Sequence, residues 1–396
     1  MPEPSTTGDA DARRGPDPSR RWRLTRWLAP ASVATVIALL ASGALSADAD
    51  PNLPPQSAAQ LLAAIGDAKI AGFSGTVVEK AALGLPELPE VAGADPATGL
   101  AGLLTGSHTI RLWYGGETRQ RIALLNSLGE QAVFRNGREL WQWDSDTRTA
   151  SHTVLPADAS GHPGPHRLPV TTPDEAARRA LAMIDPSTAV TTDRAALVAG
   201  RPAYVLVLRP KDVRSRVGSV RISVDGKTKI PLGVQVLARG ADRPAIDISF
   251  TRFSDSMPNE DNFDWTPPDG VPVTELAPPD SAGGAKPPSK QAPKQASDQT
   301  PDVSTIGAGW TTIVKLTGTP ALLRRGSGNG AANSTGSGEN STGIGSLLAN
   351  LPEVSGSWGS GRLFSSALVS GLITSDGRVY VGAVDPESLY AAAASK

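Results

Sequence analysis

Three histidines that fall in or beside one loop are the residues of this sequence that could bind a metal ion. His152, His162 and His166 lie near glycines and prolines, and Asp158 is the carboxylate close to them. Their spacing matches no common zinc-binding arrangement, and the chain has no cysteine to supply a thiolate. We therefore predict a solvated loop with no metal and no other cofactor.

Hydrolysis, for example of cell-wall polymers, is a second chemistry that the serines could support. The run STGSG at 334–338 lacks the spacing of a Gly-x-Ser-x-Gly nucleophile elbow and lies in low-complexity sequence. The glycine-rich run 326–345 also lacks the preceding strand and the Lys-Ser/Thr pair of a phosphate-binding loop. We predict no catalytic residues and a protein that is not an enzyme.

Two tryptophans favour binding over catalysis. Trp141 and Trp143 are spaced to lie on one face of a strand. Burying two indole rings in a small domain favours a cavity or a partner that covers them, with plain core packing as the alternative.

Short amphipathic strands position these residues. Val220, Ile222 and Val224 alternate with polar residues, as expected for a strand with one buried face. Turn sequences such as Asn136-Gly137 separate consecutive strands and predict antiparallel hairpins. A Gly/Pro/Ala-rich insert at 83–106 interrupts the first hairpin. The predicted strands are 73–82, 108–114, 118–125, 131–135, 139–143, 150–155, 189–197, 202–209, 219–224, 232–238 and 245–253.

Two helices accompany these strands. Ser57 can cap the first, whose apolar positions between Leu61 and Ile70 recur at helical spacing over three to four turns. The second begins at Thr172 or the following proline and is predicted to end near Asp185. Because twist accumulates over about ten strands in one block, we expect the sheet to curl strongly around the helices.

The N-terminus predicts an extracytoplasmic location. Residues 1–26 form an arginine-containing leader, which the positive-inside rule places in the cytoplasm. Residues 27–46 form an uncharged, largely apolar segment that is long enough to cross a bilayer and is either a cleaved export signal or a single anchor. Arg20-Arg21 leaves twin-arginine export open beside ordinary secretion. We expect membrane association through this end.

The rest of the chain divides into a large domain at 57–275, a Pro/Ala/Ser/Lys/Gln-rich disordered linker at 276–302, and a small α+β domain at 303–396. A low-complexity insert at 326–345 splits this small domain. In it, 363–374 and 378–384 are predicted strands, and Asp385 caps a last helix through Ala393. The formal net charge of −1 and the absence of a Lys/Arg-dense stripe argue against nucleic acid as a partner.

The order of these segments resembles LolA-like lipoprotein carriers and the N-terminal domain of the RseB/MucB envelope-stress regulators. The matching runs include FSGTVVE at 73–79, VDGKTKIPLGV at 224–234 and NFDWTPPDGVPV at 262–273. The resemblance implies an α+β fold at 57–275, in which a strongly curved antiparallel half-barrel sheet wraps around helices and encloses an apolar cavity. The insert at 83–106 and the C-terminal domain are not features of a minimal carrier.

In such a fold the bulky apolar residues of the concave face are the candidates to contact acyl chains, although a curved sheet also needs such side chains simply to pack against its helices. These candidates are Ile110, Leu112, Tyr114, Trp141, Trp143, Tyr204, Leu206, Leu208, Val220, Ile222 and Val236. Arg111, Arg119 and Arg121 could pair with a lipid phosphate or form a solvated outer face.

The function expected from this resemblance is the extracytoplasmic binding of lipid or lipoprotein acyl chains, by a carrier or chaperone. The alternative is an RseB/MucB-like regulator that binds a membrane anti-sigma factor. An enzyme is the third hypothesis.

Overall fold

The computed structural model describes residues 53–84, 105–126, 129–157, 171–277, 302–317 and 351–395. The predicted leader (1–26), the signal or anchor (27–46), nearly all of the linker, the insert at 326–345 and two histidines, His162 and His166, lie outside these residues. Within the described ranges, no helix is long and apolar enough to cross a membrane.

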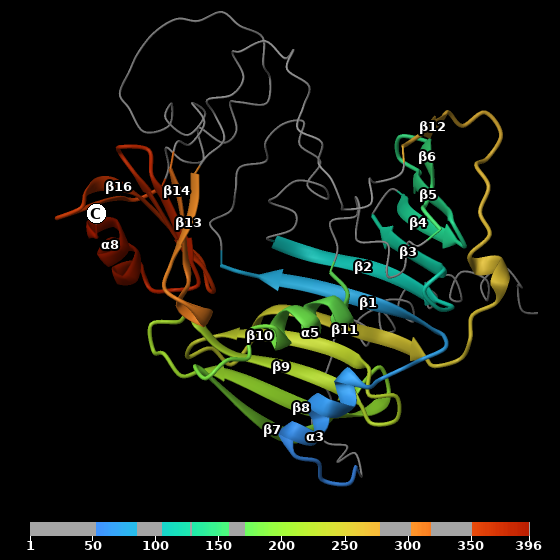
Figure 1. The fold of residues 1–396 in the computed structure, drawn as a ribbon, viewed down its shortest axis with the longest axis horizontal. Helices are drawn as coiled ribbons and strands as arrows, with labels where there is room; N and C mark the ends of the chain where they lie inside the picture. Colours follow the sequence, from blue (N-terminus) through green and yellow to red (C-terminus); the bar gives the residue numbers. More distant parts are fainter. Residues whose placement is uncertain are drawn as a thin grey trace, which may run out of the picture. The chain divides into compact units, whose positions relative to one another are not determined.

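Twelve strands form the larger sheet in the order β12-β6-β5-β4-β3-β2-β1-β11-β10-β9-β8-β7 (Figure 1). Its strands are β1 (Phe73–Ala82), β2 (Thr105–Tyr114), β3 (Arg119–Leu125), β4 (Glu130–Asn136), β5 (Glu139–Asp144), β6 (Thr149–Val154), β7 (Thr188–Val198), β8 (Arg201–Pro210), β9 (Val217–Asp225), β10 (Pro231–Ala238), β11 (Pro244–Ser254) and β12 (Val273–Glu275). The order has two ends, β12 and β7, so these strands do not close into a barrel.

Most pairs of neighbouring strands in this sheet form antiparallel hairpins, as the turn sequences predict. At the β4–β5 turn, Gly137 has a φ of 62°, a left-handed conformation that favours glycine. The prediction of a purely antiparallel sheet is wrong at one edge, because β12 pairs with β6 in parallel. The chain after β11 returns through a single-turn helix, η1 (Glu260–Asn262), and reaches β6 in that strand's own direction. The fold is therefore mostly β, with a mixed large sheet.

Three short helices complete the described structure. Helix α3 (Ala58–Gly66) begins at Ser57 in a capping box with Gln60, as predicted, but it ends before Ile70 and is shorter than three turns. Helix α5 (Pro173–Leu181) is capped by Thr172 and packs on β10 and β11. It ends before the predicted Asp185, because Asp185 instead accepts hydrogen bonds within the turn that leads into β7.

The C-terminal part forms a six-stranded antiparallel sheet in the order β13-β14-β18-β17-β16-β15. Its elements are β13 (Asp302–Ile306), the single turn η2 (Gly309–Thr311), β14 (Ile313–Thr317), β15 (Glu353–Gly356), β16 (Gly359–Ser365), β17 (Ser370–Thr374), β18 (Val379–Gly382) and α8 (Pro386–Ala394). The single strand predicted over 363–374 is wrong: Ser366 accepts a hydrogen bond from the Val369 amide, and the chain turns back there.

One hydrophobic core joins the two sheets, and the C-terminal sheet also packs on α8 in a second core that includes Leu372, Tyr380 and Leu389. The first of these, the main core, joins buried side chains of the large sheet, α3 and α5 with Trp310 of η2 and with Leu368 of the β16–β17 turn. Both residues are less than 9% exposed. Hydrogen bonds accompany the packing: the Arg216 guanidinium donates to the Ser366 carbonyl at 2.6 Å, and the Ala367 amide donates to the Leu83 carbonyl at 2.7 Å. The described structure from β1 to α8 is therefore one packed body.

Candidate functional site

One face of the large sheet is apolar across six strands, from β8 to β2. Strand register establishes it: Leu206 on β8 lies opposite Ile222 on β9, which lies opposite Val234 on β10. Val234 lies opposite Ile248 on β11, and Ile248 shares its side of that strand with Phe250. The face continues through Val77 on β1 to Ile110 on β2. We call this surface the apolar face: Val77, Ile110, Leu112, Leu206, Leu208, Val220, Ile222, Val224, Val234, Ile248 and Phe250.

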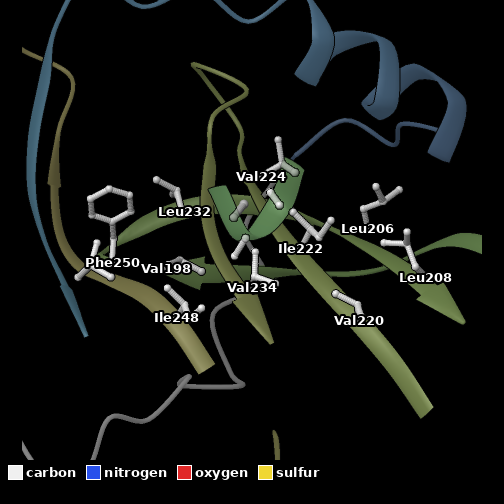
Figure 2. Close-up of a cluster of buried hydrophobic side chains, with 14 of the residues drawn as sticks. Val198, Leu206, Leu208, Val220, Ile222, Val224, Leu232, Val234, Ile248 and Phe250 are labelled. Atoms are coloured by element: carbon white, nitrogen blue, oxygen red, sulfur yellow. The ribbon is translucent and has the colours of Figure 1, made fainter. Parts of the chain in front are cut away.

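Figure 2 shows part of the apolar face, with side chains from β8 to β11 gathered on one side of the strands. Ile110, Leu206, Leu208 and Ile222 have no exposed surface, because α3, α5 and neighbouring side chains cover them. An acyl chain can therefore contact these four residues only if the covering elements move. The structure holds the buried part of this face as a packed core.

Nine of the eleven predicted contact residues lie on this side of the sheet. They include Tyr114, which stacks on Phe73 with ring centroids 5.3 Å apart. Tyr204 donates to the Pro54 carbonyl at 2.9 Å, so its hydroxyl is satisfied by the segment before α3. Val236 is half-buried at the edge of the main core. The other six are Ile110, Leu112, Leu206, Leu208, Val220 and Ile222.

Trp141 and Trp143 lie on the opposite face. Strand register shows this: Trp141 on β5 lies opposite Phe134 on β4, which lies opposite Arg121 on β3. The next residue of β3, Ile122, lies opposite Leu112 on the apolar face, so Arg121, Phe134 and Trp141 are on the other face. The eleven predicted residues therefore do not share one surface. The two tryptophans belong to an outer aromatic cluster of Trp113, Phe134, Trp141, Trp143 and Trp265.

Trp265 explains why two indoles sit together on this outer face. Its ring centroid lies 5.3 Å from that of Phe134, 5.4 Å from that of Trp141 and 5.6 Å from that of Trp143. The partner expected to cover the tryptophans is thus a later segment of the same chain. Trp265 itself, an aromatic residue in the run 262–273, was the sequence signal that this segment could cover the two tryptophans. Sequence spacing does not reveal which face of the sheet that run crosses.

The three arginines considered for phosphate binding lie on this outer side, and two of them, Arg119 and Arg121, already have partners. Arg121 donates to Glu130 at 3.0 Å, and its guanidinium lies over the rings of Trp113 and Phe134 at 4.6 and 4.7 Å. Arg119 pairs with Glu260 at 2.6 Å. Together with Arg111, which alternates with Ile110, they do not border the apolar face.

One carboxyl group interrupts the apolar face, and sequence reasoning missed it. Glu79 is two residues from Val77 on β1, on the same side of the strand, and lies opposite His108. The pKa of Glu79 is raised, because the effect of burial outweighs the hydrogen bond from the Thr171 amide and the charge of His108, which both lower it. On the same side of the sheet but beyond the apolar face, burial lowers the pKa of Arg135 on β4, which donates to the Gly137 carbonyl at 3.2 Å.

We also searched the described residues for a metal site and for pockets away from the apolar face. Across the described ranges, no group of three or more His, Cys, Asp or Glu side chains could hold a metal ion. A pocket of about 620 Å³ opens beside α8, lined in part by Ile306, Ile313 and Glu387. Apart from Arg214, which lies between β8 and β9, its lining residues belong to the C-terminal part, and none of them is on the apolar face.

Comparisons with known proteins find structural similarity at low sequence identity. No family model and no curated protein matches the chain. The structure is similar to a chain of the Pseudomonas aeruginosa MucA/MucB complex, with 15% identity, a TM-score of 0.40, and coverage of 85% of this chain and 96% of that one. It is also similar to MucB in a second complex with MucA, with 14% identity, a TM-score of 0.38, and coverage of 85% and 97%.

A LolA-superfamily protein from Nitrosomonas europaea matches a smaller share of the chain. Identity is 12%, the TM-score is 0.22, and the match covers 53% of this chain and 99% of that one. The structure is thus similar to MucB and to a LolA-superfamily protein, at low sequence identity.

Proposed function

We propose that this chain is a non-catalytic regulator outside the cytoplasm, of the MucB/RseB kind, that binds a membrane protein such as an anti-sigma factor. MucB has been solved in complex with MucA. The observation that carries the proposal is the core shared by the two sheets, in which Trp310 and Leu368 of the C-terminal part are buried against the large sheet. A lipid carrier needs only the large sheet, whereas a second sheet fixed against it provides a composite surface for a protein partner.

Backbone hydrogen bonds, in addition to apolar packing, hold the two sheets together. Ser215 and Val384 form an isolated antiparallel bridge between the sheets. On either side of it, the Arg216 amide donates to the Ala383 carbonyl at 2.9 Å, and the Asp385 amide donates to the Arg214 carbonyl at 3.1 Å. These backbone contacts set the relative position of the two sheets residue by residue, as a binding surface made of both requires.

Purification from the membranes of the native host in a mild detergent tests this proposal. We expect one single-pass membrane protein to copurify in near-stoichiometric amount and to stay bound after delipidation, because the contact is between proteins. We expect Arg216→Ala, which removes a hydrogen bond between the sheets, to weaken the complex. Arg243→Ala, at an exposed site near β11, is the matched control. A complex that dissolves on delipidation would contradict the proposal.

The binding of acyl chains is a second candidate function, which the continuous apolar face favours. In this proposal the sheet curves around α3 and α5 as a half-barrel, and an acyl chain takes the place of α5 on β10 and β11. Each methylene removed from water contributes about 0.8 kcal/mol, so a chain of a dozen carbons would compensate for displacing a short helix.

A labelling experiment tests this candidate, because the chain has no cysteine and a single one can be introduced. Val236 and Gln235 are neighbours on β10 that lie on opposite faces of the sheet. We expect an environment-sensitive dye on Val236→Cys to shift to the blue when palmitoyl-lysophosphatidylcholine is added. The same dye on Gln235→Cys should not respond. Equal responses at both positions would indicate nonspecific partition into the lipid.

The position of the tryptophans adds a second readout to the same titration. Trp141 and Trp143 lie on the outer face, so we expect their emission to stay unchanged while the Val236→Cys dye responds. A blue shift in their emission would place the ligand on the wrong side of the sheet for this candidate.

A further inference from the structure

Residues 260–276, which we call the strap, cross the outer face of the large sheet and end at its edge. Glu260 at one end pairs with Arg119, and Trp265 lies on the outer aromatic cluster. At the other end, the Ala150 amide donates to the Pro272 carbonyl at 3.2 Å, and the Leu276 amide donates to the His152 carbonyl at 2.8 Å. The strand formed there, β12, has three residues and all are exposed. Apolar burial therefore contributes little to holding β12 in place.

The side chain of His152 joins β12 to the sheet. Its Nδ1 lies 2.8 Å from Oε2 of Glu275 on β12, and its Nε2 lies 2.6 Å from Oε2 of Glu139 on β5. Its ring also stacks on Trp141 at 4.2 Å between centroids. An ionised carboxylate only accepts hydrogen bonds, so both ring nitrogens must donate. This geometry requires the doubly protonated imidazolium form of His152.

The charged groups that face this ring are the two carboxylates, one from each flanking strand. No other residue of β6 is titratable, and Trp141 is uncharged. Burial alone would lower the pKa of His152, but the hydrogen bonds and charges of Glu139 and Glu275 outweigh it, so the pKa is raised. A histidine with a raised pKa stabilises the folded contact fully below about pH 6.5 and loses that contribution as the pH rises through the higher folded-state value.

We infer that His152 is a proton-dependent latch: its imidazolium holds β12 on β6, and loss of the proton releases residues 272–276 from the edge of the sheet. A neutral imidazole has one donor and one acceptor nitrogen, so it must face one of the two carboxylates with a lone pair. Release exposes the hydrogen-bonding edge of β6, which is otherwise covered over Ala150, Ser151 and His152. The device is independent of the proposed partner and of the acyl-chain candidate.

Hydrogen–deuterium exchange of the full chain, followed by mass spectrometry of peptides that span 270–278, tests the latch. After correction for the intrinsic rate, we expect protection of this segment to fall about tenfold between pH 6 and pH 8.5, the equivalent of one charge-assisted hydrogen bond at a partly exposed site. Peptides from β8 and β9 should keep their protection over the same range, since those strands are in the core.

Two variants and one control make the test decisive. In His152→Gln and in Glu275→Gln we expect low protection of the segment at both pH values. The side chain of Glu275 is 70% exposed, so the Glu275→Gln variant should fold even if His152→Gln does not. Glu260→Gln breaks a contact of the same strap with an arginine, which stays charged throughout, and should retain the pH dependence. Protection that is independent of pH in the unsubstituted chain, or a pH dependence that survives in Glu275→Gln, would overturn the inference.

Discussion

Replacing Trp310 with alanine is expected to lower the free energy of unfolding by about 3–4 kcal/mol, as large-to-small substitutions of buried aromatic residues do. Trp310 is 8% exposed and lies in the main core, although it belongs to the single turn η2 between β13 and β14. Its indole Nε1 donates to the Thr188 hydroxyl at 2.8 Å. The substitution therefore removes both a large apolar contact and a hydrogen bond from the junction of the two sheets.

Urea unfolding followed by far-UV circular dichroism measures this effect, and two further variants separate its parts. Trp310→Phe keeps most of the packing and loses the hydrogen bond, so we expect a loss of about 1 kcal/mol. Val303→Ala, on the exposed edge strand β13 of the same sheet, should change the free energy of unfolding by less than about 0.5 kcal/mol. A loss below about 1 kcal/mol for Trp310→Ala would contradict a core shared by the two sheets, on which the proposed regulator rests.

The sequence predicted the elements whose determinants are local. Ser57 and Gln60 form the capping box that begins α3, and Thr172 caps α5, because these hydrogen bonds lie within three residues. The Asn136-Gly137 sequence correctly predicted the hairpin of β4 and β5, in which Gly137 and Arg138 form the two-residue turn. Alternation along β9 correctly places Val220, Ile222 and Val224 on the buried side.

Strand register, which is not local, separates Trp141 and Trp143 from the other candidate residues. Whether Trp141 shares a face with Ile110 depends on three successive hairpins, and a shift of one residue in any of them moves every following side chain to the other face. The segment that covers the two tryptophans contains Trp265, more than a hundred positions further along the chain. Local spacing established that the two indoles lie side by side and could not establish on which side of the sheet.

The latch at His152 shows the same limit for polar residues. In the sequence, His152 was considered only together with its neighbours His162 and His166, as a metal ligand or as part of a solvated loop, and the loop was predicted. Its partners in the fold are Glu139, across a hairpin, and Glu275, from the distant strand β12. The parallel pairing of β12 with β6 brings Glu275 next to His152. A turn sequence predicts an antiparallel hairpin but cannot predict a parallel pair of distant strands.

The second large effect is expected at the β9–β10 turn, where Asp225→Ala should cost about 3 kcal/mol of unfolding free energy. Asp225 is 1% exposed and receives two hydrogen bonds of 2.8 Å from the Arg201 guanidinium. It also accepts from the amide and the hydroxyl of Thr228, each at 2.7 Å. Removing one partner of a buried ion pair leaves the other charge without its compensation, which is costlier than losing an exposed pair. Asp255, 3.5 Å from Arg201, compensates only in part.

The same carboxylate gives this effect a defined pH dependence. Burial alone would raise the pKa of Asp225, but the hydrogen bonds from Arg201 and Thr228 and the arginine charge outweigh it and lower the pKa. Its contribution is therefore fully present above the ordinary aspartate value of about 3.9 and is lost as the pH falls through the lower folded-state value. The difference in unfolding free energy between the unsubstituted chain and Asp225→Ala should be constant from about pH 5 to pH 7 and should shrink below about pH 4.

Asp193→Ala is the matched control, because Asp193 also pairs with an arginine, Arg221, but both side chains are more than a third exposed. Exposed pairs contribute at most about 1 kcal/mol, since water solvates both charges once the contact is broken. We therefore expect Asp193→Ala to lower the free energy of unfolding far less than Asp225→Ala at pH 7. Equal losses for the two variants would mean that burial does not determine the strength of these pairs, and that the β9–β10 turn is not held by its carboxylate.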